Sequence, residues 1–403
     1  MDKKPNISDI KKAQENLKDV LNPTKLIYSN IFSNEFENEI YLKPENLQKT
    51  GAFKIRGAYN TIKNLSKEDR KNGLICSSAG NHAQGVAYAA KELGVKATIV
   101  MPKFTPFIKV EGTKQLGANV VLSGKVYDEA YEKAKELQKE HDYVFVHPFE
   151  NPDVIAGQGT IGLEIHEELS DVDYVIVPIG GGGLISGIAI ALKEMNPNIK
   201  VIGVEPTGAC AMKMSLENKG LTYLKSVDTI ADGVAVRKPG KLTYSIIKDY
   251  VDEIVTVDDF ELMDALIVLI EKHKLIAEPS GALSIAAVKK LNVKDKKIVS
   301  VISGGNIDLV TISSMINKGL VSRGRLLCFT VDLPDIPGEM VKIAQTLADN
   351  NANIIKLDHD KFKSSTRLTN VQLEVTVETN GHEHIEQLID SLLEHGYSIS
   401  RLY

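Results

Sequence analysis

The sequence predicts an α/β protein built on parallel or mixed twisted sheets with flanking helices, followed by a smaller domain of another kind at the carboxyl end. Over most of the 403 residues, short apolar runs alternate with segments of helical periodicity, and this alternation is typical of βαβ units. The runs are almost continuously apolar, which indicates sheets covered on both faces. After about residue 325 the order of the elements changes.

Two series of elements divide the first part, residues 1–320, into two lobes. We expect the smaller lobe at about 48–148 and the larger lobe in the remainder. Apolar runs predict strands at 74–78, 97–102, 119–124, 143–148, 174–179, 200–206, 253–257 and 297–303. Apolar residues at helical spacing predict helices at 83–94, 126–141, 184–195 and 259–273. Asp258 precedes the last helix as its expected N-cap.

The composition shifts at KGLVSRGR (318–325), which is polar and contains glycine as linkers do, and we expect the linker at 321–325. Beyond it, strand-like and helix-like segments follow in the order βαββαβ. These segments are 326–333, 340–351, 353–360, 371–379, 384–396 and 397–403. The order predicts a ferredoxin-like domain over residues 326–403.

The bulk properties exclude several classes of function. A net charge of −5 argues against a nucleic-acid binder. No apolar run is long enough to span a bilayer, and the first twenty residues lack the apolar core of a signal peptide. Cys76, Cys210 and Cys328 are far apart and form no CxxC pair, which fits a reducing compartment. We expect a cytoplasmic protein that binds neither nucleic acid nor membrane.

Residues 49–58, KTGAFKIRGA, place Lys54 among small and apolar neighbours. One interpretation is an ordinary helix start with Lys54 and Arg56 solvated. The other is a lysine kept poorly hydrated, because burial lowers the pKa of a lysine and makes its free amine available as a nucleophile. The stretch alone leaves both interpretations open.

Four consecutive glycines, 180–183, separate an expected strand from an expected helix in VPIGGGGLISG. Such a loop exposes backbone N–H groups at a helix N-terminus and can bind a phosphate, which a Cβ would keep at a distance. The alternative is a tight βα turn. No Gly-Lys-Ser/Thr follows, so the loop is not a P-loop, and the GxGxxG spacing of dinucleotide sites is only loosely met.

Two more stretches place polar side chains at the ends of expected strands. CSSAGNHAQGVA (76–87) leads into a helix whose N-terminus could hold a carboxylate, unless Asn81 or Ser78 simply caps it. In VISGGNID (301–308), Ser303 ends a strand and would face a ligand crevice. Together with Lys54 and the glycines, these stretches supply the contacts that pyridoxal 5′-phosphate (PLP) needs.

Six motifs make a resemblance specific. KTGAFKIRGA, SSAGNHAQGVA, VIAGQGTIGLEI, VPIGGGGLISG, ADGVAV and ISGGNID occur in this order over about residues 20–320. In these motifs the chain resembles the fold-type II, tryptophan-synthase-β-like PLP enzymes, and among them the threonine ammonia-lyases (threonine dehydratases). The tail, 326–403, resembles an ACT domain, a small regulatory fold that commonly binds amino acids, and DLPDIPGEM fits its first strand, loop and helix.

The resemblance implies roles for the matching residues. Lys54 would form the Schiff base, Phe53 would pack against the pyridine ring, and Ser303 would meet the pyridine nitrogen. Asn81 would hydrogen-bond the 3′-oxygen of the cofactor. The phosphate would be bound by the N–H groups of Gly180, Gly181, Gly182, Gly183 and Leu184. The substrate carboxylate would be surrounded by Ser78, Ala79, Asn81 and His82.

The implied reaction is β-elimination from L-threonine to 2-oxobutanoate and ammonia, with L-serine to pyruvate as a side activity. A hydroxyl at Ser303 cannot hold a proton on the pyridine nitrogen as a carboxylate would. The ring is then a weaker electron sink, and prompt loss of a β-leaving group is favoured. Lys54 would be the general base, and His82 and His147 are expected to take no part in proton transfer.

Several alternatives stay open. Serine racemases of this group carry a second serine where this chain has Ala79, and a methyl group cannot move a proton. A β-replacing synthase, such as cysteine synthase or threonine synthase, would need a pocket for a second nucleophile. A non-catalytic amino-acid sensor would use only the tail. A divalent cation is known near the position of Glu205 in the racemase branch, but we expect Glu205 to be a solvated strand end and no metal to bind.

The ACT-like tail also implies partners. Isoleucine and valine are the usual effectors in the family, and ACT folds usually pair across a subunit interface, which implies a homodimer or homotetramer. The sign of the effect and the biosynthetic or catabolic role stay open.

Overall fold

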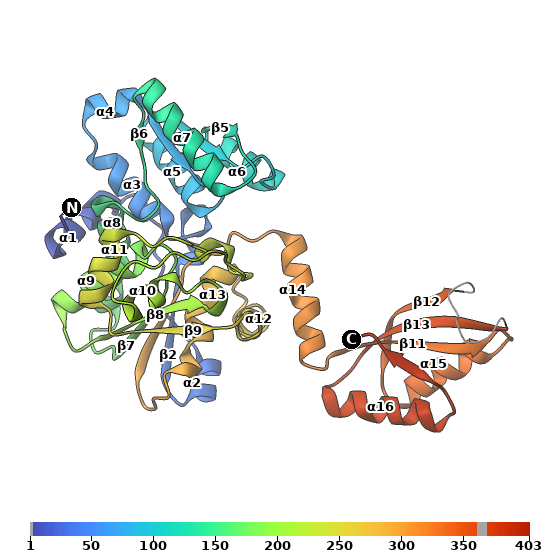
Figure 1. Ribbon diagram of the computed structural model, residues 1–403. Helices are drawn as coiled ribbons and strands as arrows, with labels where there is room; N and C mark the ends of the chain where they lie inside the picture. Colours follow the sequence, from blue (N-terminus) through green and yellow to red (C-terminus); the bar gives the residue numbers. More distant parts are fainter. Residues whose placement is uncertain (1–2, 361–368) are drawn as a thin grey trace. The chain divides into compact units, whose positions relative to one another are not determined.

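Residues 3–360 and 369–403 are described by the computed structural model, in which the chain divides into two units, 1–307 and 308–403 (Figure 1). The composition had suggested a boundary near residue 320 and a linker at 321–325. The structure has a helix, α14 (Leu309–Ser322), before β11 (Leu326–Pro334), and residues 323–325 of the expected linker connect the two elements. Among the residues of α14 only Gly319 is buried, so this helix has no buried face whose pattern could have distinguished it from a linker.

The larger sheet of the first unit has six strands in the order β1-β2-β10-β7-β8-β9, and all neighbours except β1 and β2 are parallel. In sheet order the strands are Ile27–Tyr28, Glu39–Pro44, Lys297–Ile302, Tyr174–Pro178, Lys200–Pro206 and Glu253–Val257. The four predicted strands are confirmed, and their central residues are buried. The sequence pattern did not predict β1 and β2.

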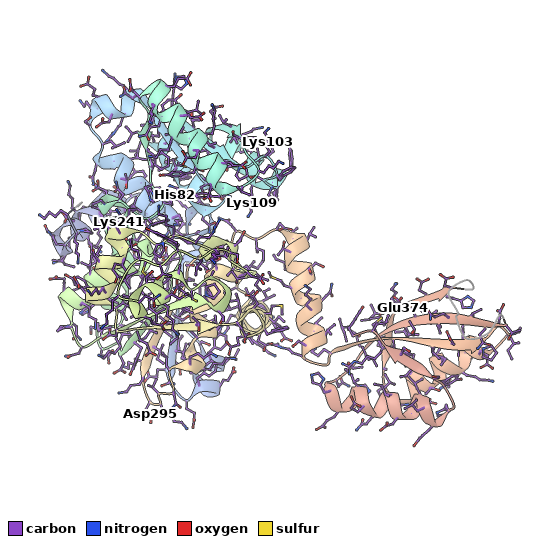
Figure 2. The ribbon with its side chains drawn as sticks, viewed as in Figure 1. His82, Lys103, Lys109, Lys241, Asp295 and Glu374 are labelled. Carbon is purple, nitrogen blue, oxygen red and sulfur yellow. The ribbon has the colours of Figure 1, made fainter. Side chains whose placement is uncertain are left out.

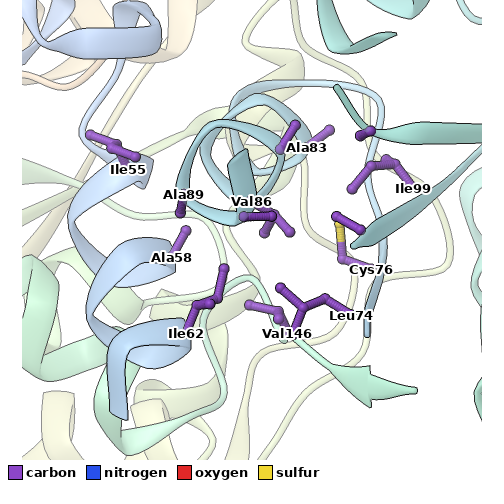
Figure 3. Packing of buried hydrophobic residues seen from close by; sticks show 14 of the residues in the cluster. Ile55, Ala58, Ile62, Leu74, Cys76, Ala83, Val86, Ala89, Ile99 and Val146 are labelled. Carbon is purple, nitrogen blue, oxygen red and sulfur yellow. The ribbon is translucent and has the colours of Figure 1, made fainter. Parts of the chain in front are cut away.

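The small sheet is parallel, with the strand order β5-β4-β3-β6. Its strands are Asn119–Leu122, Ala97–Met101, Leu74–Ser77 and Val144–Phe145. It is accompanied by α4 (Lys67–Asn72), α5 (Asn81–Glu92), α6 (Phe107–Gln115) and α7 (Tyr127–His141). Figure 3 shows Ala58 of α3 (Lys54–Asn64) facing Ala89 of α5, and small side chains let these two helices pack closely.

The remaining helices of the first unit surround the large sheet. They are α1 (Ile7–Leu17), α2 (Asn30–Phe36), α8 (Pro152–Glu168), α9 (Gly183–Met195), α10 (Ala211–Glu217), α11 (Lys241–Tyr250), α12 (Asp259–Val268) and α13 (Pro279–Ala286). Asp258 caps α12 in a capping box with Glu261, as predicted. The expected helix 259–273 ends as an α-helix at Val268 and continues as a π-helical turn.

The motif VIAGQGTIGLEI lies in the middle of α8, and its glycines serve helix packing. A Cβ at Gly157 would lie 2.6 Å from the Cα of Gly57 on α3. A Cβ at Gly159 would lie 2.9 Å from the carbonyl oxygen of Gly187 on α9. The motif therefore brings α3, which begins with Lys54, and α9, which follows the four glycines, close to the same helix.

The second unit has an antiparallel sheet in the order β12-β13-β11-β14. Its elements follow the chain order βαββαβ: β11 (Leu326–Pro334), α15 (Glu339–Asp349), β12 (Asn353–Asp360), β13 (Asn370–Glu378), α16 (His382–Glu394) and β14 (Ile399–Arg401). Apolar residues of the sheet and both helices form one core. Among the described residues, no helix combines the length and the apolar character that crossing a bilayer requires.

Candidate active site

Two neighbouring strands of the large sheet bring two of the predicted motifs together. β7 and β10 are paired in parallel, so their carboxyl ends lie at the same edge. The four glycines follow β7, and Ser303 follows β10. The sequence predicted both strand ends, and the strand order makes them neighbours.

The segment before Lys54 is attached directly to this edge. Ala52 forms an isolated antiparallel bridge with Gly304, and the N–H of Phe53 donates to the carbonyl oxygen of Ser303 at 3.1 Å. Phe53 itself is buried, and Lys54 begins α3 immediately after it. The predicted lysine and the predicted strand-end serine therefore belong to one site.

The amine of Lys54 lies in a poorly hydrated environment. Its Nζ donates to the carbonyl oxygen of Pro148 at 3.0 Å and lies 5.1 Å from the centre of the Phe53 ring. Burial lowers the pKa of Lys54 to about 8, and the carboxyl group of Glu278 partly opposes this shift. Of the two interpretations of KTGAFKIRGA, the structure supports the poorly hydrated lysine.

Arg56 is also not solvated, which contradicts the other part of the ordinary interpretation. Its side chain is fully buried and donates to Glu45 through Nε at 2.8 Å and through Nη2 at 2.7 Å. It also pairs with Glu164 on α8, which in turn accepts from the buried Lys43. Burial alone would raise the pKa of Glu164, but Arg56 outweighs it and holds the pKa below its ordinary value. Arg56 therefore anchors α3 to α8 two residues after Lys54.

A cavity of about 520 Å³ borders this ion-pair cluster and not the predicted site. Its lining includes Thr160 and Glu164 of α8 and residues of α1, and it includes none of the predicted site residues.

The glycine loop leaves the N-terminus of α9 open. Gly182 is the N-cap residue with a φ of +91°, and no side chain caps the helix. A Cβ at Gly181 would lie 2.2 Å from the ring of Phe149, so packing as well as anion access requires glycine there. Phe149 follows Pro148, the partner of Lys54, which places the open helix end on the lysine side of the site. Open N–H groups at a helix N-terminus suit a phosphate.

The N-terminus of α5 is open as well. Neither Asn81 nor Ser78 caps it, since the N-cap residue is Gly80 and no side chain caps the helix. The hydroxyl of Ser78 accepts from the N–H of Gly80 at 3.3 Å, outside the helix. A carboxylate could therefore bind to the first N–H groups of α5, with Ala79 beside them.

The imidazole of His82 points away from such a ligand. It is buried, it hydrogen-bonds the carbonyl group of Val146 at 2.9 Å, and burial together with the charge of Lys54 lowers its pKa to about 3. His82 can offer a ligand its backbone N–H. His147 accepts the N–H groups of Phe149 and Glu150 through Nδ1, and burial lowers its pKa to about 4. Neither imidazole is placed for proton transfer.

Two residues of the site, Glu278 and Asn306, were not predicted from the sequence, and both contact Asn81. Asn81 donates through Nδ2 to Glu278 at 2.6 Å, and its Oδ1 accepts from Asn306 at 2.6 Å. Asn306 lies within the quoted motif ISGGNID, and this was the available signal. Glu278 lies in a stretch that matched no pattern, so only the structure places it in the site.

The residues present fit the expected cofactor. The Oγ of Ser280, beside Ser303 and Gly233, is buried and has no hydrogen-bond partner among the described residues. Ser303 is buried, and its Oγ makes only a long contact of 3.4 Å to the carbonyl oxygen of Ser280. The site thus offers two hydroxyl groups with few hydrogen bonds, two uncapped helix N-termini and a desolvated amine. This set matches a ligand with a phosphate, a ring nitrogen and an aldehyde.

Glu205 is not the solvated strand end that the sequence suggested. It is buried, and it accepts the N–H groups of Met212 and Lys213 at 3.0 and 2.8 Å, so it caps α10. Burial raises its pKa to about 7. Across residues 3–360 and 369–403, no three His, Cys, Asp or Glu side chains are grouped so that they could hold a metal ion.

Comparisons with known proteins identify the family to which this chain is similar. Residues 17–304 match the family model described as "Pyridoxal-phosphate dependent enzyme". The chain is 48% identical to the L-threonine ammonia-lyase of Thermotoga maritima over 98% of both chains. Two solved structures are similar. Maize serine racemase has 37% identity, a TM-score of 0.75, and coverage of 79% of this chain and 99% of its own. The processed threonine deaminase isoform 2 of Solanum lycopersicum has 38% identity, a TM-score of 0.74, and coverage of 78% and 90%.

The family model spans the segment that holds Lys54, both open helix ends and Ser303. The chain therefore belongs to the family of pyridoxal-phosphate-dependent enzymes.

Proposed function

We propose that this chain is a PLP-dependent threonine ammonia-lyase, which converts L-threonine to 2-oxobutanoate and ammonia and L-serine to pyruvate more slowly. The observation that carries the proposal is the desolvated amine of Lys54 in a site with two open helix N-termini. The identity of 48% with the Thermotoga maritima enzyme over nearly the whole chain supports it.

The residues divide the work between binding and proton transfer. The N–H groups from Gly180 to Leu184 would hold the phosphate of the cofactor, and Phe53 would pack against its ring. Ser303 would meet the ring nitrogen, and Asn81 would bond the 3′-oxygen. When bound, the cofactor supplies the electron sink for charge that develops at the α-carbon of the substrate.

Lys54 then acts as the general base at the substrate α-carbon. With its pKa lowered to about 8, a useful fraction of the amine is neutral near pH 7.5 and can accept the α-proton. The carboxylate of the substrate binds the N-terminus of α5, beside Ser78, Ala79, Asn81 and the N–H of His82. This geometry presents the α-carbon to Lys54, because α5 packs against the start of α3.

A serine racemase is the second candidate, because the maize enzyme is a close structural neighbour. Racemisation needs a proton donor on the face opposite Lys54. The residue before Gly80 is Ala79, whose methyl group cannot donate. We therefore favour β-elimination over racemisation as the reaction of this chain.

The second unit is proposed to be an ACT-like regulatory domain of a homodimer or homotetramer. A cavity of about 290 Å³ lies at the loop between β11 and α15 and is lined by residues 333–340, His359 and Val371. It is large enough for an amino acid, and we propose isoleucine or valine as its ligand. We also keep the cytoplasm as the proposed location.

The proposal is tested by supplying purified protein with PLP and measuring oxo acids and amino-acid chirality from L-threonine and L-serine. Formation of 2-oxobutanoate as the faster product supports the lyase. Formation of D-serine without any oxo acid would favour the racemase. No product from either substrate would refute both the lyase and the racemase.

A further inference from the structure

Glu278 is a buried carboxyl group for which the proposed reaction has no use. It occupies the N-cap position of α13, yet its side chain does not cap that helix. The side chain instead reaches Nδ2 of Asn81 at 2.6 Å, across 197 positions of the chain. Only 6% of Glu278 is exposed. Because Glu278 does not cap its own helix and instead accepts a hydrogen bond from Asn81, we expect its function to lie at Asn81.

The surrounding backbone holds this carboxyl group in place. The N–H of Glu278 donates to the carbonyl oxygen of Gly304 at 3.0 Å, which ties it to the residue after Ser303. A Cβ at position 304 would lie 2.5 Å from Oε1 of Glu278, so a side chain there would displace the carboxyl group. Glycine at 304 therefore preserves the contact with Asn81.

The amide of Asn81 is fixed at both ends. Its Oδ1 accepts from Nδ2 of Asn306, and that nitrogen also donates to the carbonyl oxygen of Thr50 at 2.7 Å. Its Nδ2 donates to Glu278. An exchange of the two amide ends would place Nδ2 against a donor and Oδ1 against a carboxylate. One hydrogen of Nδ2 is used by Glu278, and the other remains for a ligand.

Charged groups from three elements face Glu278. Burial and the charge of Asp232 raise its pKa, to about 7, while the bond from Asn81 and the charges of Lys109 on α6 and Lys54 on α3 act in the opposite direction. Lys109 and Asp232 are themselves paired at 3.4 Å. Figure 2 labels Lys109 and His82, which lie at the side of the small sheet nearest the large sheet. The hydrogen bond from Asn81 is the contact that connects this carboxyl group to the site.

We propose that Glu278 is a positioning residue that orients the Asn81 amide toward the 3′-oxygen of the cofactor. The proposal rests on the proposed function for the identity of the cofactor and for the role of Asn81. Glu278 acts through Asn81, from which it accepts a hydrogen bond.

The test compares Glu278→Gln with Glu205→Gln. Both side chains are buried carboxyl groups with raised pKa values, but Glu205 caps α10 and does not contact Asn81. PLP is titrated into the apo-protein and followed by visible absorbance in the absence of substrate. Loss of a charged acceptor is expected to weaken PLP binding about tenfold in Glu278→Gln. Glu205→Gln is expected to bind PLP as the wild type does.

The second readout is the coupling between Glu278 and Asn81, measured from the PLP affinities of the single and double variants. Asn81→Ala should weaken binding by a similar factor, and the double variant by less than the product of the two factors. Wild-type affinity in Glu278→Gln, or full additivity with Asn81→Ala, would overturn the proposal.

Two further arrangements keep the result clear. Urea unfolding of each apo-protein shows whether it folds. If Glu278→Gln does not fold, Glu278→Asp replaces it and should weaken PLP binding, because the shorter side chain cannot reach Asn81, and unchanged binding would again overturn the proposal. The titrations need no turnover, so a protein that fails to release 2-oxobutanoate refutes the proposed function and leaves this inference to be decided by binding alone.

Discussion

The backbone N–H of Phe53 donates to the carbonyl oxygen of Ser303 at 3.1 Å. These two residues lie in different motifs, one before Lys54 and one at the end of β10. Their hydrogen bond fixes the distance between the amine proposed to bond the cofactor and the hydroxyl proposed to meet its ring nitrogen. The site therefore depends on a backbone contact whose partners are far apart in the chain.

Lys54→Ala is expected to lower 2-oxobutanoate formation at least about 10³-fold, because it removes both the bonding amine and the general base. Coupled oxo-acid assays at saturating L-threonine measure the loss. The control is Lys241→Ala, since Lys241 is an exposed lysine at the start of α11 (Figure 2). Turnover in Lys54→Ala comparable to the control would contradict the assignment.

The rate of PLP association with the apo-protein is expected to rise about tenfold per pH unit and to level off near pH 8. The neutral amine is the reactive form, and burial lowers the pKa of Lys54 to about 8. Stopped-flow absorbance measures the rate. Nα-acetyllysine in solution, whose ε-amine is free, is the control and should level off near its ordinary pKa of about 10.4. The same midpoint for both amines would show that Lys54 is solvated.

Arg56→Ala is expected to destabilise the first unit by about 3–5 kcal/mol, because it removes the charged partner of the fully buried Glu45. Urea unfolding of the apo-protein measures the change. Lys297→Ala removes an ion pair with the exposed Asp171 and is the control, expected to leave the unfolding midpoint unchanged. A change in Arg56→Ala no larger than in the control would show that the buried cluster is unimportant for stability.

Wild-type protein is expected to lose stability relative to Glu205→Gln as the pH rises from 5 to 8. Burial raises the folded-state pKa of Glu205 from 4.5 to about 7. Its contribution is therefore fully present below the unfolded pKa and is lost as pH rises through about 7, by about 1–3 kcal/mol. Gln does not titrate. Unfolding free energies in urea at the two pH values measure the difference, and a pH-independent difference would refute the shift.

Gly338→Ala is expected to weaken the response to isoleucine or valine about tenfold without changing basal turnover. Gly338 lines the cavity of the second unit with a φ of +101°, which a side chain tolerates poorly. Gly381→Ala is the matched control, since Gly381 has a φ of +121° at the start of α16 and does not line that cavity. An equal effector response in the two variants would show that this cavity does not bind the effector.

The sequence predicted the strands that carry the site better than it predicted the contacts within it. Apolar runs identified β7 and β10, and the glycines and Ser303 after them were recognised as strand-end residues. Glu278 was missed because an isolated glutamate carries no spacing signal. The sequence did not decide whether Arg56 is solvated or buried, because local sequence does not show that Glu45 and Glu164 lie beside it.

Residue types and local periodicity, which the chain carries by itself, determined the alternation of strands and helices, the four glycines, and the lysine among small neighbours. Only the tertiary structure decided that β10 lies beside β7, that the Lys54 amine loses its water, and that Asn81 is held between Glu278 and Asn306. Strand order and desolvation depend on residues distant in the chain, so the chemistry of each group is set by neighbours that local sequence does not identify.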